Sequence, residues 1–458
     1  TLEVRLADRR VPLALTLQPF SAQAHAQPTR LYGAAELLTA TRAAYPPGMG
    51  GRLPVLTGWA GWKARVLIAA AKLSWVRRRF AGAWVFSDRA ENADDNAEHL
   101  YRWVRVHQPQ INAWFLLNRD SQDWTRLAQE GFRLVPRGLR RKLLILNSEH
   151  VVSSQPDSSD GGFDLKRYAS VMLWRFTYLR HGVQVNDQSH WLNANRIDRL
   201  IASSPDEYAA VVDDDTPYRL SRKCVRLTGM PRHDQLLKLS QQMPAAQIDA
   251  IVIFPTWRAR LVDRRSAARR ADFRASEFAQ HWADLLSSDA LRSMAQRHRK
   301  RLVFIAHSDI TPYLDALRIP DYVEVHTKAH GSIQDVLCRA ALLVTDYSSI
   351  AFEAAYLRRP VCYYQFDQDA FFGGDHNWRR GYFDFDRDGF GPVALTEAQL
   401  LNDVERALAH GVQPEAVYQQ RMERALPNRD SGACQRVFDS ILEIRMPFLK
   451  STFQAAST

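Results

Sequence analysis

The fold is indicated most clearly by LLVTDYSSIAFE, residues 342–353, which we call the deciding stretch. It begins as a short apolar run of the kind found in buried strands, continues into a polar turn and then enters a helical pattern. A buried strand that passes directly into a helix is typical of an α/β domain with a parallel sheet. The polar turn follows the carboxyl end of the strand, which is where such domains bind their ligands.

The same alternation of strands and helices continues on both sides of this stretch. A first series of apolar runs lies at 83–87, 113–117, 151–152, 176–179, 200–202 and 225–227. A second series lies at 251–254, 302–305, 322–325, 342–344 and 361–364. Short apolar strands separated by helices predict a parallel sheet covered on both faces. Two such series in tandem predict two Rossmann-like domains, at 83–245 and 246–458, with a ligand site in the cleft between them.

The chain upstream of the first series has a different character. Residues 1–58 contain an alternating pattern that predicts a β-hairpin, followed by a linker rich in Pro and Gly. Because the chain begins with Thr1 and not with Met, we expect it to be a fragment, and the hairpin to be the remnant of an upstream domain. Residues 59–82 then form a basic helical segment. Within it, 62–80 carries six basic side chains, no acidic ones, and the aromatic residues Trp62 and Trp75. Such a helix could lie on an anionic lipid surface, or pack as a surface helix on the next domain.

Composition narrows the classes of partner. The chain has 458 residues, and its 61 basic and 50 acidic residues give a net charge of +11, which favours anionic partners. We expect none of these to be nucleic acid, because no nucleic-acid-binding motif occurs. No apolar run is long enough to span a membrane, and no secretory signal opens the chain. The four cysteines lie too far apart for a disulfide framework or a zinc site, so a cytoplasmic protein is expected.

The polar turn of the deciding stretch has two interpretations. Asp346, Ser348 and Ser349 are residue types that cap helices wherever helices begin. The same hydroxyls and free backbone N–H groups, at the start of a helix, also bind phosphate. The chemistry of the residues alone leaves both interpretations open.

Several motifs resemble one known family. TDYSS at 345–349, LRRPV at 357–361 and RGYFD at 380–384 resemble the CDP-glycerol glycerophosphotransferases, which are teichoic acid primases and polymerases and related capsule polymerases. ADDNA at 93–97, GMPRHD at 229–234 and PTWR at 255–258 agree, and the motifs occur in the order usual for the family. The resemblance covers roughly residues 83–445. It implies the GT-B fold, with a CDP-polyol donor held mainly by the second domain and the acceptor approached from the first.

The resemblance also implies a catalytic residue. Transfer of a polyol phosphate requires an acceptor hydroxyl to attack the donor's β-phosphorus and expel CMP, so a base must take the hydroxyl proton. His181 directly follows a predicted strand and matches the His-Gly motif of the family, whose histidine is proposed as that base. Arg180 replaces the Trp that usually precedes it. A lone histidine can also be structural.

Further resemblance implies a donor site in the second domain. The residues that would hold the donor phosphates are Arg258, His307, Thr345, Asp346, Ser348 and Ser349. The planar guanidinium of an arginine can donate two parallel hydrogen bonds to a phosphate, although a solvated surface arginine is the alternative. His307 stands where the family has a His-Pro pair, here with Ser308 in place of the proline, and could equally be a surface histidine. Glu353 would accept hydrogen bonds from the ribose, unless it is an ordinary exposed helical residue.

Two other features leave their roles open. Asp384 and Asp386 imitate the Asp-x-Asp of metal-dependent glycosyltransferases, but they follow the Arg-Gly-Tyr of the 380–384 motif in an expected loop. The GT-B fold that the resemblance implies generally works without a metal, so we predict no metal and no cofactor beyond the substrate. Seven arginines between 258 and 274 could form a solvated insert, a site for a phosphate-rich polymer or a lipid contact. No P-loop and no GxGxxG fingerprint occurs, which argues against a P-loop nucleoside triphosphatase or an enzyme that binds a dinucleotide cofactor through that fingerprint.

The sequence therefore predicts a polyol-phosphate transferase that uses CDP-glycerol or CDP-ribitol. Its acceptor would be a polyanionic or lipid-linked glycan, a teichoic-acid-like or capsule polymer, and the enzyme would be peripheral at the inner face of the cell membrane. Two alternatives remain: a nucleotide-sugar glycosyltransferase on the same scaffold, since a fold does not determine its donor, and a non-catalytic basic binding module. The choice of polyol, the acceptor, the number of units added and the oligomeric state stay open.

Overall fold

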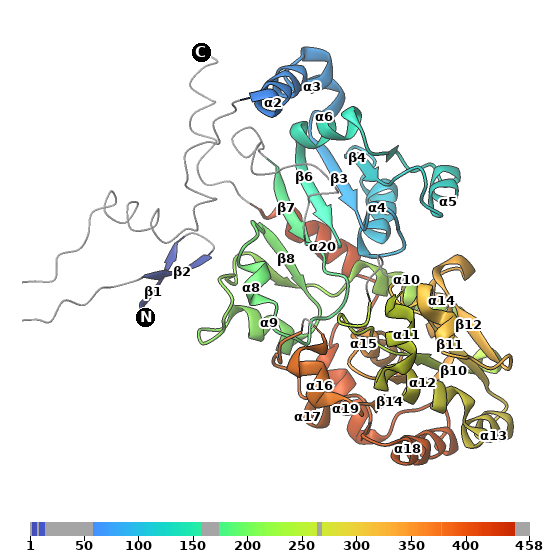
Figure 1. Cartoon of the computed structure of the whole chain (residues 1–458). Coiled ribbons are helices and arrows are strands. Elements are labelled where there is room, and N and C mark those ends of the chain that lie inside the picture. The colour runs from blue at the N-terminus through green and yellow to red at the C-terminus, as the bar shows by residue number, and fades with distance from the viewer. Residues whose placement is uncertain are drawn as a thin grey trace, which may run out of the picture.

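The computed structural model describes residues 2–6, 9–13, 58–156, 174–262, 268–376 and 378–444. Within these ranges the chain forms two α/β domains, stacked one above the other in Figure 1. The seven arginines predicted as a basic cluster fall partly outside the described residues, because 263–267 are among those left out. So does most of the linker expected before residue 58.

The N-terminal domain is built on a seven-stranded parallel sheet with the order β5-β4-β3-β6-β7-β8-β9. Its strands are β3 (Ala83–Ser87), β4 (Asn112–Leu116), β5 (Leu134–Val135), β6 (Ser148–Ser153), β7 (Arg175–Tyr178), β8 (Arg199–Ala202) and β9 (Val225–Leu227). Its helices are α4 (Asn96–His107), α5 (Trp124–Gln129), α6 (Leu139–Asn147), α8 (Ser189–Leu192), α9 (Pro205–Val212) and α10 (Pro231–Gln242). Neighbouring residues of β3 point to opposite faces: Val85 joins the core under α6, whereas Trp84 and Phe86 join the core under α4.

The C-terminal domain has a six-stranded parallel sheet with the order β12-β11-β10-β13-β14-β15. Its strands are β10 (Ala250–Phe254), β11 (Arg301–Ile305), β12 (Val323–His326), β13 (Ala340–Thr345), β14 (Val361–Tyr364) and β15 (Val393–Ala394). Helices on one face are α11 (Ala268–Ala275), α12 (Glu277–Ser287), α13 (Asp289–Arg297) and α18 (Glu397–Ala409), and those on the other are α14 (Ile333–Cys338), α15 (Ile350–Tyr356) and α19 (Ala416–Ala425). Two short helices, α16 (Gln368–Ala370) and α17 (Phe385–Asp388), lie in the connection between β14 and β15.

Both sheets have the same strand order over their first six strands. In each, the first strand of the domain lies beside the fourth: β3 beside β6, and β10 beside β13. Strands are therefore added to the sheet on one side of this pair first and then on the other side. Doubly wound sheets bind ligands in the crevice outside the carboxyl ends of such a pair of strands. The deciding stretch forms β13 and α15, so its polar turn, residues 346–349, lies at this point of the second domain.

The strands predicted from apolar runs are confirmed to within about two residues, apart from the start of β6, and so is the pair of α/β domains. Two strands were not predicted, β5 and β15, because each has only two residues and lies at the edge of its sheet. Among the described N-terminal residues, β1 (Leu2–Leu6) pairs antiparallel with β2 (Arg9–Leu13).

The basic segment after the linker is not one helix but two, α2 (Gly58–Ala71) and α3 (Ser74–Phe80). Leu73 separates them, with extended backbone angles of φ −57° and ψ 135°. Leu67, Val76 and Phe80 pack with α6, which places both helices at the end of the N-terminal domain away from the C-terminal domain (Figure 1). None of the described helices combines the length and the apolar character needed to cross a membrane.

The end of the described chain returns to the first domain. α20 (Ala433–Leu442), red in Figure 1, packs its side chains Val437, Phe438 and Ile441 into the same core as Trp84. Arg199 of β8 donates a hydrogen bond from Nε to the carbonyl oxygen of Ser440 at 2.9 Å. The two domains are thus joined twice, by the chain around α10 and by this returning helix.

Candidate active site

His181 is presented to solvent by a turn that follows β7. Arg180 adopts a left-handed conformation with φ 62°, and its buried side chain donates from Nε to the carbonyl oxygen of Ile201 at 3.0 Å. Asn96 of α4 donates to the carbonyl oxygen of Arg180 at 2.9 Å, which fixes the turn from the other side. The imidazole of His181 leaves this anchored turn with 58% of its side chain exposed.

The imidazole has one fixed partner, Asp95. His181 Nδ1 is hydrogen-bonded to the carboxylate oxygen Oδ2 of Asp95, the residue that caps the N-terminus of α4. When Nδ1 carries the proton and donates a hydrogen bond to the carboxylate, the second ring nitrogen, Nε2, keeps its lone pair. The arrangement can therefore accept a proton at Nε2, on the edge of the ring opposite to Asp95.

Asp95 is ionised. Burial raises the pKa of this carboxyl, but His181 and Arg232, with a hydrogen bond from the backbone N–H of Asn96, outweigh burial and hold it well below its usual value. The Asn96 N–H lies 2.8 Å from Oδ1, and Arg232 Nη1 lies 2.6 Å from the same oxygen. A charged carboxylate is the form that orients the imidazole.

Arg232 joins the two domains at this point. It lies in the first turn of α10, and its Nη1 donates to Asp95 and, at 2.6 Å, to the carbonyl oxygen of His181. On its other side, Nε donates to Oε1 of Glu353 in α15 at 3.1 Å, and Nη2 pairs with the same oxygen. The sequence predicts a ribose contact for Glu353. In the structure this carboxylate is buried against Arg232 and His233, which overcome the effect of burial and lower its pKa to about 2.

The turn of the deciding stretch meets the turn of His181. A Cβ atom placed on Gly182 would lie 3.2 Å from Cβ of Ser349 and closer still to its hydroxyl. Glycine is the residue type that permits this approach without a clash. The structure thus brings together His181 and Ser349, which the sequence predicts for different domains of one site.

Three other predicted site residues lie in or beside a buried ion cluster. Arg258 donates from Nη1 to Asp346 at 2.9 Å and from Nε to Asp367 at 2.7 Å. It also donates from Nη2 to Asp367 and from Nη1 to a backbone carbonyl, so four of its five N–H groups are used inside the protein. Thr345 is equally buried and donates to the carbonyl oxygen of Phe254 at 2.7 Å. The predicted phosphate contacts Arg258, Thr345 and Asp346 therefore lie beneath the surface, whereas Ser348 and Ser349 are half-buried.

His307 lies next to this cluster. It follows β11, its ring stacks on Trp257 with centroids 6.1 Å apart, and about a quarter of its side chain is exposed. Trp257 also contacts His376, edge to face at 4.8 Å. Burial, with Arg258 and His307 nearby, lowers the pKa of His376 to about 3, so this ring is neutral. His307 is therefore the more accessible of the two histidines, since His376 is buried.

The described residues offer no evident metal site. Within these ranges no three His, Cys, Asp or Glu side chains lie close enough to hold a metal ion. Asp384 caps α17 by accepting from the N–H of Arg387 at 2.8 Å, as an ordinary helix cap does. The Asp-x-Asp pattern noted in the sequence is thus used in local structure.

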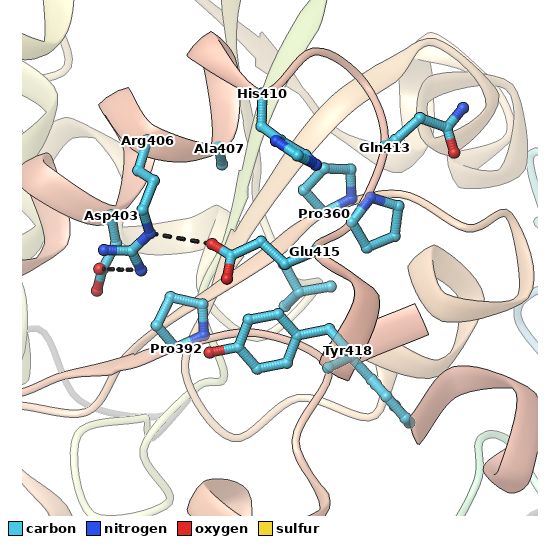
Figure 2. A pocket seen from close by; sticks show the side chains of 12 residues that line it. Pro360, Pro392, Asp403, Arg406, Ala407, His410, Gln413, Glu415 and Tyr418 are labelled. Carbon is cyan, nitrogen blue, oxygen red and sulfur yellow. Dashed lines mark hydrogen bonds and ion pairs between the residues drawn. The ribbon is translucent and has the colours of Figure 1, made fainter. Parts of the chain in front are cut away.

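A small pocket lies elsewhere, between α18 and α19 (Figure 2). Its charged lining residues pair with one another: Arg406 donates to Glu415 at 3.0 Å and to Asp403 at 2.7 Å. Pro360, another lining residue, immediately precedes β14. The pocket is therefore at the amino ends of the strands, the edge opposite to His307 and the 346–349 turn.

A known protein family matches most of this chain. Residues 70–443 match the family described as CDP-glycerol:poly(glycerophosphate) glycerophosphotransferase. The chain belongs to this family. The resemblance inferred from the motifs is thereby confirmed.

Two curated relatives of this family member are named as teichoic acid proteins. The minor teichoic acid biosynthesis protein GgaB of Bacillus subtilis (strain 168) is 29% identical over 371 residues, which are 79% of this chain and 40% of that protein. The teichoic acid glycerol-phosphate transferase of Staphylococcus aureus (strain NCTC 8325 / PS 47) is 23% identical over 266 residues, 55% of this chain and 61% of that protein. The chain thus spans about two fifths to three fifths of the length of these relatives.

A solved structure confirms the fold. The wall teichoic acid polymerase TagF superposes with a TM-score of 0.59 and 15% identity, over 83% of this chain and 93% of that chain. The glycerophosphotransferase family member described here therefore has the predicted GT-B architecture. Asp95 and Arg232 lie in two of the motifs noted above, but their roles were not predictable, because their partners His181 and Glu353 lie 86 and 121 residues away.

Proposed function

We propose that this chain transfers a polyol phosphate from CDP-glycerol or CDP-ribitol to a hydroxyl of a teichoic-acid-like or capsule polymer, with release of CMP. Membership of the glycerophosphotransferase family supports the donor class. The observation that carries the mechanism is the exposed imidazole of His181, which Asp95 fixes at Nδ1. The next residue of its turn, Gly182, lies against Ser349 of the second domain.

In this reaction the acceptor oxygen forms a bond to the β-phosphorus of the donor while the bond to the bridging oxygen of CMP breaks. The acceptor proton goes to Nε2 of His181, and CMP leaves with the bonding electrons. Ser348, Ser349 and His307, whose side chains are half-buried and accessible, would contact the donor phosphates. Because the side chains of Arg258, Thr345, Asp346 and Glu353 are buried, we propose that they support these contacts and do not bind the donor directly.

The test is CMP release by the purified chain, with CDP-glycerol and CDP-ribitol in parallel and a teichoic acid fragment as acceptor. Loss of a general base typically lowers the rate by about 10²- to 10⁴-fold, so we expect His181→Ala to do so while donor binding persists. His190→Ala, which removes another exposed histidine from the same domain, is the matched control and should keep full activity. Turnover of UDP-sugars alone would favour a glycosyltransferase, and unchanged turnover in His181→Ala would refute the assignment of the base.

We extend the proposal to location, at an anionic surface on the inner face of the cell membrane. The side of α2 and α3 away from the core exposes Val66, Leu73 and Trp75, the last with 61% of its surface accessible. Exposed basic side chains surround them, at Lys72, Arg77 and Arg78 among others. Aromatic and basic residues together suit an anionic lipid interface, and α3 contains no acidic residue.

Sedimentation with vesicles tests this part separately. We expect binding to vesicles of phosphatidylglycerol and phosphatidylcholine but not to phosphatidylcholine alone, with weakening at high salt. Leu73→Ser with Trp75→Ser should reduce binding. Val106→Ser on α4, an exposed apolar residue of the same domain, should leave it unchanged. Equal binding to neutral vesicles would contradict the electrostatic part of the proposal.

A further inference from the structure

A chain of alternating charges crosses the domain junction and ends at the proposed base. Glu353 of α15 pairs with Arg232 of α10, Arg232 pairs with Asp95 of α4, and Asp95 is bonded to His181. Its first three members are buried or nearly so, and its last is exposed. The described structure therefore links a helix that begins at the 346–349 turn to an imidazole in the other domain.

Arg232 is tied to this junction by more than its ion pairs. Its backbone N–H donates to Asn96 Oδ1 at 3.1 Å, and Asn96 in turn donates to the carbonyl oxygen of Arg180. Its guanidinium donates to the carbonyl oxygen of His181 itself. Arg232 thus holds both the carboxylate that orients the imidazole and the backbone that carries it.

The helix at the other end of the chain is equally well placed. Glu353 lies one turn into α15, and Ser349, the residue that precedes α15, contacts Gly182. The junction between the domains therefore has two contacts close together: one between backbone turns, at Gly182 and Ser349, and one between charges, at Arg232 and Glu353.

We infer that Arg232 is a positioning residue, held by Glu353, that sets the Asp95–His181 pair against the 346–349 turn so that the base faces the reacting phosphate. This inference rests on the proposed function. Arg232 would touch neither substrate nor product, and it would act wholly through His181. Its contribution should then vanish when His181 is absent.

The geometry of a guanidinium is required for this role. Arg232 uses a planar fork to reach Asp95, a backbone carbonyl and Glu353 at once, whereas an ammonium group is a single point of charge on a flexible stem. Because misplacement of a catalytic group by about 1 Å can cost about 10²-fold in rate, we expect a fall of that order in kcat for Arg232→Lys. The Kd for CDP-glycerol should change by less than about threefold, since the donor contacts proposed above are retained.

The deciding experiment is a double-mutant cycle on CMP release, with Arg232→Lys and His181→Ala alone and combined. Residues that act as one unit are strongly non-additive. We expect Arg232→Lys to lower kcat about 10²-fold in the otherwise unchanged chain and less than about threefold in the His181→Ala background. A purely structural role would lower both backgrounds equally, and that result would overturn the inference.

A matched control lies on the same helix. Asp234 of α10 accepts hydrogen bonds at 2.9 Å from the N–H groups of Ala433 and Cys434 at the start of α20, so Asp234→Asn also weakens a contact of α10 without facing His181. Its effect on kcat should be small and additive with His181→Ala. If Arg232→Lys fails to fold, Glu353→Gln, which preserves shape, replaces it in the same cycle.

The outcomes separate the two proposals. If the unchanged chain releases CMP but the cycle is additive for both Arg232→Lys and Glu353→Gln, the inference fails and the proposed function stands. If the unchanged chain turns over no CDP-polyol, the proposed function fails and the inference falls with it. A non-additive cycle with an unchanged donor Kd supports both.

Discussion

Two buried arginines, Arg232 and Arg258, are held in nearly the same way and serve different ends. Each pairs with two carboxylates from distant parts of the sequence: Arg232 with Asp95 and Glu353, and Arg258 with Asp346 and Asp367. The partners of Arg232 belong to different domains, and one of them holds an exposed imidazole. Those of Arg258 lie in one domain.

The surroundings of the two arginines differ as much as their partners. Three aromatic rings enclose Arg258, with its guanidinium carbon 4.6 Å from the ring centre of Phe371, 4.8 Å from Phe278 and 5.2 Å from Tyr347. Arg232 has Asp95, His181 and Glu353 around it instead. We therefore expect the ion pairs of Arg258, inside one domain, to stabilise the 346–349 turn. We expect those of Arg232, at the domain junction, to position the proposed base. The following changes separate the two roles.

The largest expected effect is on stability, at Arg258. Its removal leaves Asp346 and Asp367 buried without their cation, and breaking a buried pair in this way costs about 3–5 kcal/mol. We therefore expect Arg258→Ala to lower the midpoint of urea unfolding severely or to prevent folding. Arg260→Ala, two residues away and with a side chain 72% exposed, should change the unfolding free energy by less than about 1 kcal/mol. A stable, inactive Arg258→Ala would instead indicate direct contact with the donor.

The next effect is on activity, at Asp95. Asp95→Asn keeps the shape but removes the charge that orients His181, so we expect kcat to fall by about 10²-fold, within the range that loss of the base itself would give. Stability should fall less than in Arg258→Ala, because Asp95 is only one of the two carboxylates that pair with Arg232. Steady-state CMP release and urea unfolding of the same preparation measure both. If Asp95→Asn lost stability but kept its activity, the cluster around Arg232 would serve only stability, as we expect of the cluster around Arg258.

The contact between the two turns gives a smaller effect. Gly182→Ala places a methyl group against Ser349, and overpacking of this kind costs about 1–3 kcal/mol. The double variant Gly182→Ala with Ser349→Gly should recover stability in thermal unfolding. It should not recover CMP release, because Ser349 is proposed to contact the donor. Recovery of both would show that Ser349 only fills space.

The contrast between the two arginines also shows how far the sequence can be interpreted. Strands such as β3 and β10 were predictable because their apolar runs reflect burial on both faces of a parallel sheet. Arg258 follows β10 in a recognisable motif, which indicated its importance but not whether its side chain would face a ligand or the core. That depends on Asp367, 109 residues away, and on aromatic rings from other segments.

The proposed base was predictable for a different reason. His181 follows a strand and belongs to a short motif, so local sequence placed it at the edge of the sheet. Its orientation was not predictable, since Asp95 and Arg232 reach it from 86 and 51 residues away. Local sequence indicates which residues stand at strand ends, whereas long-range packing decides which of them meet.

The smallest effect concerns pH and separates Glu353 from the rest of the junction. Arg232 and His233 lower the pKa of Glu353 from an ordinary 4.5 to about 2, against the effect of burial. A carboxyl whose pKa is lower in the folded state stabilises the fold above its unfolded pKa, and this contribution is lost as the pH falls from about 4.5 toward 2. Glu353→Gln should therefore be less stable at pH 7 and should lose less stability than the unchanged chain over that interval. Glu98, also buried and with a pKa lowered to about 2, titrates in both proteins, so acid still destabilises the variant and the difference between the two curves is what reports on Glu353. Urea unfolding at pH 7, 4.5 and 3 measures that difference, and parallel curves would mean that Arg232 does not hold Glu353 in its charged form.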